Sequence, residues 1–129
     1  MNKILVEVSV GELLDKISIL GIKKEKIKDP EKLKFINDEY DILKNQLNKN
    51  VKSDEKLDNL FQSLKEINAK LWVIEDDKRL CEKNSDYGEK FIKLSRNVHF
   101  LNDDRAKIKL NINNHTGSKI KEIKEYTNY

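Results

Sequence analysis

Two stretches of the sequence place charged residues within apolar stripes that otherwise have helical spacing. Residues 71–84 read LWVIEDDKRLCEKN, and residues 100–113 read FLNDDRAKIKLNIN. The apolar stripe skips one position in each stretch, which is Lys78 in the first and Arg105 in the second. A guanidinium at a core-facing position needs a carboxylate, an amide or a bound anion, because an unpaired buried charge is costly. Polar chemistry in this chain is therefore expected around Arg105.

The two stretches are expected to lie side by side. The short polar segment KNSDYGEK between them predicts two antiparallel helices, in which residues whose numbers sum to roughly 172 face each other. This register places Asn68 near Arg105 and Glu75 or Asp76 near Arg96. The protein groups expected to pair with Arg105 are Asn68, Glu75, Glu12 and Asp15, of which the last two belong to the first helix.

Two kinds of site are consistent with such a cluster. In a ligand site, Arg, Lys and Glu side chains between the helices would hold a small anion electrostatically. The candidate ligand-binding residues are Glu12, Asp15, Lys16, Asn68, Glu75, Arg79, Arg96, Asn102, Arg105 and Lys109. In a structural cluster, the same charges pair within the protein, and the charge runs beside them form i,i+4 pairs on solvated helix faces.

Most of the charge in the two stretches is interpreted as solvent-exposed, because charge runs usually mark the surface of a helix. This interpretation covers Asp77, Lys78, Asp103 and Asp104. For Arg105, Asn102 and Glu75 both kinds of site stay open. Trp72 is interpreted as a core or interface residue.

Other kinds of site lack their sequence signatures. A di-metal carboxylate bundle needs Glu-x-x-His pairs on two helices, and the sequence has none. His99 and His115 have no carboxylate at metal-ligand spacing, and no Gly-rich phosphate loop or nucleophile motif occurs. We therefore expect neither a metal nor a cofactor. The lone Cys81 is expected to be a small core residue, and a single cysteine fits a reducing cytoplasm best.

Length and composition limit the architecture and the partners. A chain of 129 residues predicts one helical domain over residues 1–129, and four Gly with one Pro favour long helices. The 26 basic and 23 acidic residues are interleaved, so we expect no nucleic-acid partner. The apolar stretch near the N-terminus is short and is broken by Glu7, so neither export nor a membrane span is expected.

The apolar spacing predicts an all-α fold, an antiparallel four-helix bundle preceded by an extended arm at residues 1–9. ILVEVSV, residues 4–10, is β-branched enough to predict one short strand. The bundle is expected to cover residues 10–114, with helices over 10–28, 30–48, 54–84 and 87–114. Residues 115–129 form a tail, for which a helix and an extended chain both stay open.

Local signals mark the ends of these helices. The expected N-terminal caps are Ser9 with Glu12, Asp29 before Pro30, Ser53 or Asp54, and Asp86 with Glu89. Gly117 is expected to be the left-handed residue that ends the last helix. The second helix carries apolar residues at a strict three-four spacing that is typical of coiled-coil packing.

The first helix is apolar around more of its circumference than a surface helix needs. Leu13, Ile17 and Leu20 form its main stripe, whereas Ile19 and Ile22 lie on the opposite side. This pattern implies a second contact surface, so this helix is either central in the bundle or meets another chain. We expect a homodimer.

Three motifs resemble a bacterial family of unknown function along nearly the whole chain. They are VSVGELLDKISILGIKKEKI, LWVIEDDKRLCEKNSDYGEKFIKLSRNVHFLNDDRAKIKLNIN and TGSKIKEIKEY. The family pattern is approximately GELxDKxxIL, LWxIEDxxRxCE and FIxLxRxVxxxNDxRAxxK. The matching residues are Gly11, Glu12, Asp15, Lys16, Trp72, Glu75, Asp76, Arg79, Glu82, Arg96, Asn102, Asp103, Arg105 and Lys109. The chain departs from the pattern at Gly21, Lys78 and His99.

The resemblance implies an association but no reaction. Members of the family look like neighbours of glycosyltransferase and surface-polysaccharide genes, which implies a role in envelope polysaccharide biosynthesis with a glycosyltransferase as partner. One hypothesis is a non-catalytic helical interaction or accessory module, which explains the absence of a catalytic motif and the apolar first helix. The alternative is a small all-α enzyme or binder of an anionic small molecule that uses the Arg, Lys and Glu cluster. Whether the chain is an enzyme stays open.

Overall fold

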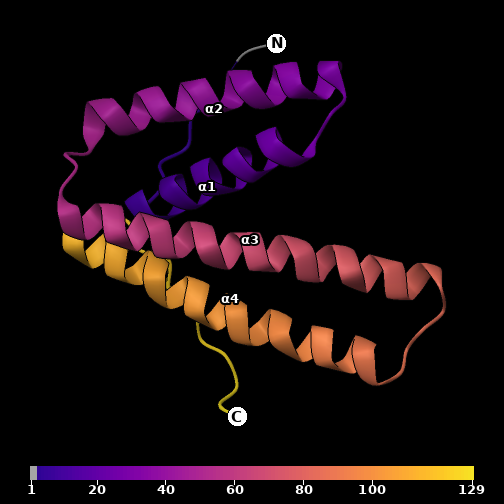
Figure 1. The fold of residues 1–129 in the computed structure, drawn as a ribbon. Helices are drawn as coiled ribbons and strands as arrows, with labels where there is room; N and C mark the ends of the chain where they lie inside the picture. The colour runs from indigo at the N-terminus through magenta and orange to yellow at the C-terminus, as the bar shows by residue number, and fades with distance from the viewer. Residues whose placement is uncertain (1–2) are drawn as a thin grey trace.

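The computed structural model describes residues 3–129, and four α-helices make up the fold of this part of the chain (Figure 1). They are α1 (Val10–Lys26), α2 (Pro30–Asn50), α3 (Glu55–Lys83) and α4 (Glu89–Thr116). Every helix boundary lies within two residues of the expected one, so the all-α prediction is confirmed. The tail from Ser118 onward forms neither a helix nor a strand.

The helix caps explain where three of the four helices begin. Ser9 Oγ accepts a hydrogen bond from Glu12 N at 3.0 Å, Asp29 Oδ1 from Glu31 N at 3.1 Å, and Asp54 Oδ1 from Leu57 N at 2.7 Å. These side chains satisfy backbone donors that have no partner within the helix. Gly117, at φ 66°, has the expected left-handed conformation after α4.

Two local predictions are wrong. Asp86 does not cap α4: the N-cap is Gly88, whose N–H donates to Asp86 Oδ1 at 3.2 Å in a turn before the helix. The strand expected at residues 4–10 is absent from the described residues 3–9, and Val10 already belongs to α1. A strand needs a neighbouring strand for its backbone groups, and the helices of the described chain offer none. Ile4 and Leu5 are instead about nine-tenths exposed.

The helices form layers with α1 at the centre (Figure 1). The two longest helices, α3 and α4, form an antiparallel hairpin; α1 lies on this hairpin, and α2 packs chiefly against α1. This position explains the apolar circumference of α1, because Ile19 and Ile22 are half-buried within the chain. The sequence argument for a homodimer through α1 is thereby removed, because the central position alone accounts for both apolar sides.

The main core lies where α3 begins and α4 ends. Leu14, Leu57, Leu64 and Ile112 form a buried cluster against which the end of α2 also packs. The opposite half of the α3–α4 hairpin extends beyond α1 and α2 (Figure 1). There the two helices cover mainly each other, with Cys81 buried as expected.

A glycine sets the close approach of α1 to α4. A Cβ built on Gly11 would lie 2.6 Å from the Lys109 carbonyl oxygen, so only glycine fits at this distance. The Gly11 N–H donates to Asn113 Oδ1 at 2.7 Å, and the Val10 N–H donates to Ser118 Oγ at 3.2 Å. These contacts fix the start of α1 against α4 and the tail. They also fix which α1 side chains face Arg105.

Candidate functional site

A buried carboxylate stands at the centre of the predicted cluster. Asp15 of α1 is only 2% exposed. Arg105 of α4 binds both of its oxygens: Nε donates to Oδ1 at 3.0 Å and Nη2 donates to Oδ2. Asn68 Nδ2 of α3 donates to Oδ1 at 2.8 Å. Three helices therefore meet at one carboxylate, in the bidentate geometry that makes Arg–carboxylate pairs strong.

Neighbouring side chains occupy the remaining donors. Arg105 Nη1 donates to Asn102 Oδ1 at 3.4 Å, one helical turn earlier on α4. Asn68 Nδ2 also donates to Ser18 Oγ at 3.0 Å, one turn after Asp15 on α1. Each nitrogen of the Arg105 guanidinium thus has a protein acceptor.

A second cation extends the cluster toward the tail. Lys109 Nζ lies 2.8 Å from Glu12 Oε2, 3.6 Å from Asp15 Oδ2 and 3.2 Å from Glu122 Oε2. The Glu12 carboxylate, which the sequence predicted would close a capping box with Ser9, accepts from Lys109 instead. Lys16 lies 3.9 Å from Glu12 at the exposed edge. Carboxylates and cations thus alternate from α1 across α4 to the tail.

The cluster shifts the ionisation of its members. Burial acts to raise the pKa of Asp15, but hydrogen bonds from Arg105 and Asn68 and the charges of Arg105 and Lys109 lower this pKa by more. The pKa of Arg105 is raised, chiefly by its hydrogen bonds to Asp15. For Lys109, burial acts to lower the pKa, and the contacts with Glu12 and Asp15 raise it overall. All three groups are therefore held in their charged forms.

This arrangement predicts an acid-dependent loss of stability. Because the pKa of Asp15 is lower in the folded than in the unfolded chain, its pairing stabilises the fold above the unfolded value, about 3.9, and this contribution is lost as the pH falls through the folded pKa. Denaturant unfolding measured from neutral pH down to about pH 3 should show a smaller acid-induced loss in Asp15→Asn than in the unmodified protein. Equal losses in the two proteins would contradict this assignment. Glu122 and Asp54, whose pKa values are also lowered, titrate in both.

The structure brings seven of the ten candidate residues together. They are Glu12, Asp15, Lys16, Asn68, Asn102, Arg105 and Lys109. Glu75, Arg79 and Arg96 lie apart from the cluster and are exposed. The expected pairing of Glu75 with Arg105 is wrong, because α1 crosses the hairpin at Asn68 and Glu75 lies two turns farther along α3. The guanidinium of Arg96 stands 5.7 Å from the centre of the Phe100 ring.

Sequence reasoning missed three residues that contribute to the cluster or to the contact between α1 and α4. Ser18 follows Asp15 by one turn and could have been found as a polar residue among apolar ones on the same face. Asn113 holds Gly11 and lies beside a core isoleucine in α4. Glu122 gave no signal, because its position depends on how the tail runs back along α4.

The cluster is closed. Among the described residues, no buried side-chain nitrogen or oxygen lacks a hydrogen-bond partner. Within the same part of the chain, no group of three or more His, Cys, Asp or Glu side chains is placed to hold a metal ion. The site can hold three helices together, but it presents no unpaired cation to an anion.

Residues 3–129 also contain no helix with the length and apolar character needed to cross a bilayer.

These features define a class of protein, an all-α bundle whose central helix is fixed by a buried, fully paired ionic cluster. The particular family follows from comparison with known proteins. The chain belongs to a family of unknown function (DUF6165), whose model matches residues 4–129. The expectation that the chain belongs to a family of unknown function is confirmed. No curated protein and no solved structure matches the chain.

Proposed function

We propose that this protein is a non-catalytic helical interaction module that forms a homodimer through the extended half of its α3–α4 hairpin. The bidentate ion pair of Arg105 with Asp15 carries the choice against the alternative. A binder of anions through this cluster would need a cation whose charge is not already paired, whereas Arg105 is paired with Asp15 and Lys109 with Glu12. Charged residues at core positions are thereby explained by helix packing.

The proposed contact surface is an apolar groove along α3 and α4. It has a volume of about 660 Å³ and is lined chiefly by Val73, Ile74, Phe100 and Leu101. Val73 is 51% exposed and Phe100 is 39% exposed. Leu80 and Ile92, nearer the turn between the helices, are also about half-exposed. Contiguous apolar surface of this kind is typical of protein interfaces.

The charges beside this groove favour a second copy as the partner. Asp76 and Asp77 follow Val73 on α3, whereas Lys93 and Arg96 precede Phe100 on α4. A twofold axis along the hairpin would place α3 of one copy over α4 of its partner. Asp76 of each copy would then face Arg96 of the other copy, with apolar residues between the two pairs.

Sedimentation of surface variants tests the dimer. The unmodified chain should sediment at micromolar concentration as a species of twice its 15.2 kDa mass. Val73→Asp should shift it to the monomer, because a carboxylate in the apolar centre of the contact would lose its water without gaining a partner. Ile42→Asp is the matched control, since Ile42 is 52% exposed on α2, away from this surface. A monomer for the unmodified chain, or equal effects of both substitutions, would contradict the proposal.

The envelope-polysaccharide role and the glycosyltransferase partner remain part of this proposal. Their support is the gene association that the sequence resemblance implies. A dimeric module without catalytic groups is suited to holding two copies of such an enzyme together. Co-purification with a glycosyltransferase encoded beside the gene tests the partner directly.

A further inference from the structure

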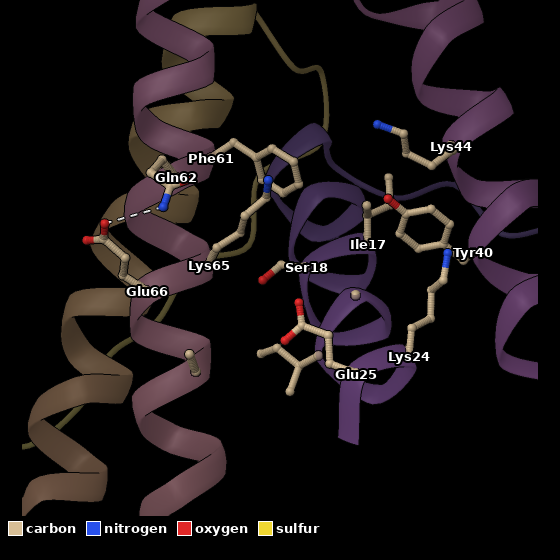
Figure 2. A pocket seen from close by; sticks show the side chains of 13 residues that line it. Ile17, Ser18, Lys24, Glu25, Tyr40, Lys44, Phe61, Gln62, Lys65 and Glu66 are labelled. Carbon is tan, nitrogen blue, oxygen red and sulfur yellow. Dashed lines mark hydrogen bonds between the residues drawn. The ribbon is translucent and has the colours of Figure 1, made fainter. Parts of the chain in front are cut away.

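A second cavity is lined by α1, α2 and α3, and it shares Ala69 with the hairpin groove. Figure 2 shows it between α2 and α3, with α1 as its floor. Its volume is about 530 Å³, within the range of small-molecule sites. The cavity exists because α2 packs chiefly against α1 and its backbone does not approach that of α3 closely.

Each of the three helices contributes one lysine to this cavity. Lys24 comes from α1, Lys44 from α2 and Lys65 from α3. Within the described chain, none of the three lies within 4.0 Å of a carboxylate oxygen. This is the opposite of the Asp15 cluster, in which every cation is paired. Three lysines against two glutamates, Glu25 and Glu66, give the cavity lining an excess of positive charge, which favours an anion inside it.

Aromatic rings hold two of these ammonium groups at the cavity. Lys24 Nζ stands 4.1 Å from the centre of the Tyr40 ring, and Lys65 Nζ stands 4.3 Å from the centre of the Phe61 ring. Contacts of this kind attract a cation without neutralising its charge, so the ammonium groups keep their donors for a ligand.

Gly21 keeps the floor of the cavity open. Glycine is among the least favourable residues inside a helix, and it is normally explained by the close approach of another element. That explanation holds for Gly11 but fails for Gly21, because a Cβ built on Gly21 would meet no atom within 4 Å. Because Gly21 lines the cavity, glycine here leaves space that a larger side chain would occupy.

We infer that this cavity binds a small organic phosphate with two or more negative charges. Lysine binds phosphate as a compact point charge, and lysines from three helices line this one cavity. Glu25 and Glu66 line the same cavity and can accept hydrogen bonds from hydroxyl groups of the organic part. The two carboxylates also repel long polyanions, which favours a small ligand over nucleic acid.

Titration with inorganic pyrophosphate, followed by amide NMR shifts at constant ionic strength, tests this site. The unmodified protein should show saturable shifts at the cavity residues. The variant with both Lys44→Gln and Lys65→Gln should bind at least about tenfold more weakly, which corresponds to a loss of roughly 1.4 kcal/mol. Gly21→Leu should also lose binding while unfolding at an equal or higher denaturant concentration, because its side chain enters empty space.

Two controls separate the cavity from general charge effects. Lys34→Gln removes one positive charge, half the change of the double variant, from an exposed position on α2 outside the cavity and should leave the affinity unchanged. Val73→Asp, which tests the dimer, should also bind pyrophosphate as the unmodified protein does, so the two proposals fail separately. The absence of saturable binding, unchanged affinity in Gly21→Leu, or equal losses in Lys34→Gln and the double variant would overturn the inference.

Discussion

Arg105→Leu should lower the free energy of unfolding by about 3 to 5 kcal/mol, the usual effect of removing one partner from a buried ion pair. Leucine keeps apolar volume at this helix position but leaves the Asp15 carboxylate, 2% exposed, without its bidentate donor. Asn68 and Lys109 remain near Asp15 and compensate only in part, since Lys109 is 3.6 Å away and already binds Glu12. Denaturant unfolding at neutral pH measures the difference.

A matched substitution shows whether burial causes this effect. Arg79→Leu makes the same chemical change at an exposed position of α3 and should alter stability by no more than about 0.5 kcal/mol. Combining Arg105→Leu with Asp15→Leu removes both charges, so the double variant should be less destabilised than the sum of the two single variants. If Arg105→Leu is as stable as the unmodified protein, the cluster is a strained site for an anion, and the proposed non-catalytic role is wrong.

The sequence predicted the helices well because their signals are local. Ser9, Asp29 and Asp54 cap the helix starts as expected, and apolar spacing of three and four residues marks the packed faces. The wrong cap at Asp86 has a local cause too, because its side chain bonds Gly88 N within a turn and α4 starts after that turn. Distinguishing these two geometries requires backbone angles that residue types do not specify.

The sequence predicted the residues of the cluster only where it also predicted which helices pair and in what register. The antiparallel register of α3 and α4 placed Asn68 beside Arg105, and both do bind the same carboxylate. Which carboxylate this is depends on where α1 crosses the hairpin, and that crossing is set by Gly11 against Lys109. Sequence spacing within α3 and α4 contains no information about this crossing, so Glu75 and Asp15 could not be distinguished.

The cavity between α2 and α3 was not predicted for a similar reason. A regular bundle would have placed α2 against α3 as well as α1, which would have buried the lysine stems between the helices. The actual arrangement leaves α2 with no fully buried residue. How far two helices separate depends on side-chain volumes at a contact between distant segments, and apolar periodicity describes each helix alone.

The two glycines of α1 should respond in opposite directions to the same substitution. In Gly11→Ala, the new Cβ would lie 2.6 Å from the Lys109 carbonyl oxygen, which is backbone and cannot rotate away, so α1 must move from α4. That movement weakens the hydrogen bond from Gly11 N to Asn113 Oδ1 and the contact of Glu12 with Lys109, and we expect a loss of about 1 to 3 kcal/mol, as for other overpacked sites.

Gly21→Ala supplies the matched control for this prediction, because it makes the same change in the same helix at a position where the new Cβ meets nothing within 4 Å. It should raise the free energy of unfolding by about 0.5 to 1 kcal/mol, the difference in helix propensity between alanine and glycine. Denaturant midpoints of the two variants, measured with equal slopes, give both values. Stabilisation by Gly11→Ala would show that α1 and α4 lie farther apart than described, and the alignment of Asp15 with Arg105 would then lose its basis.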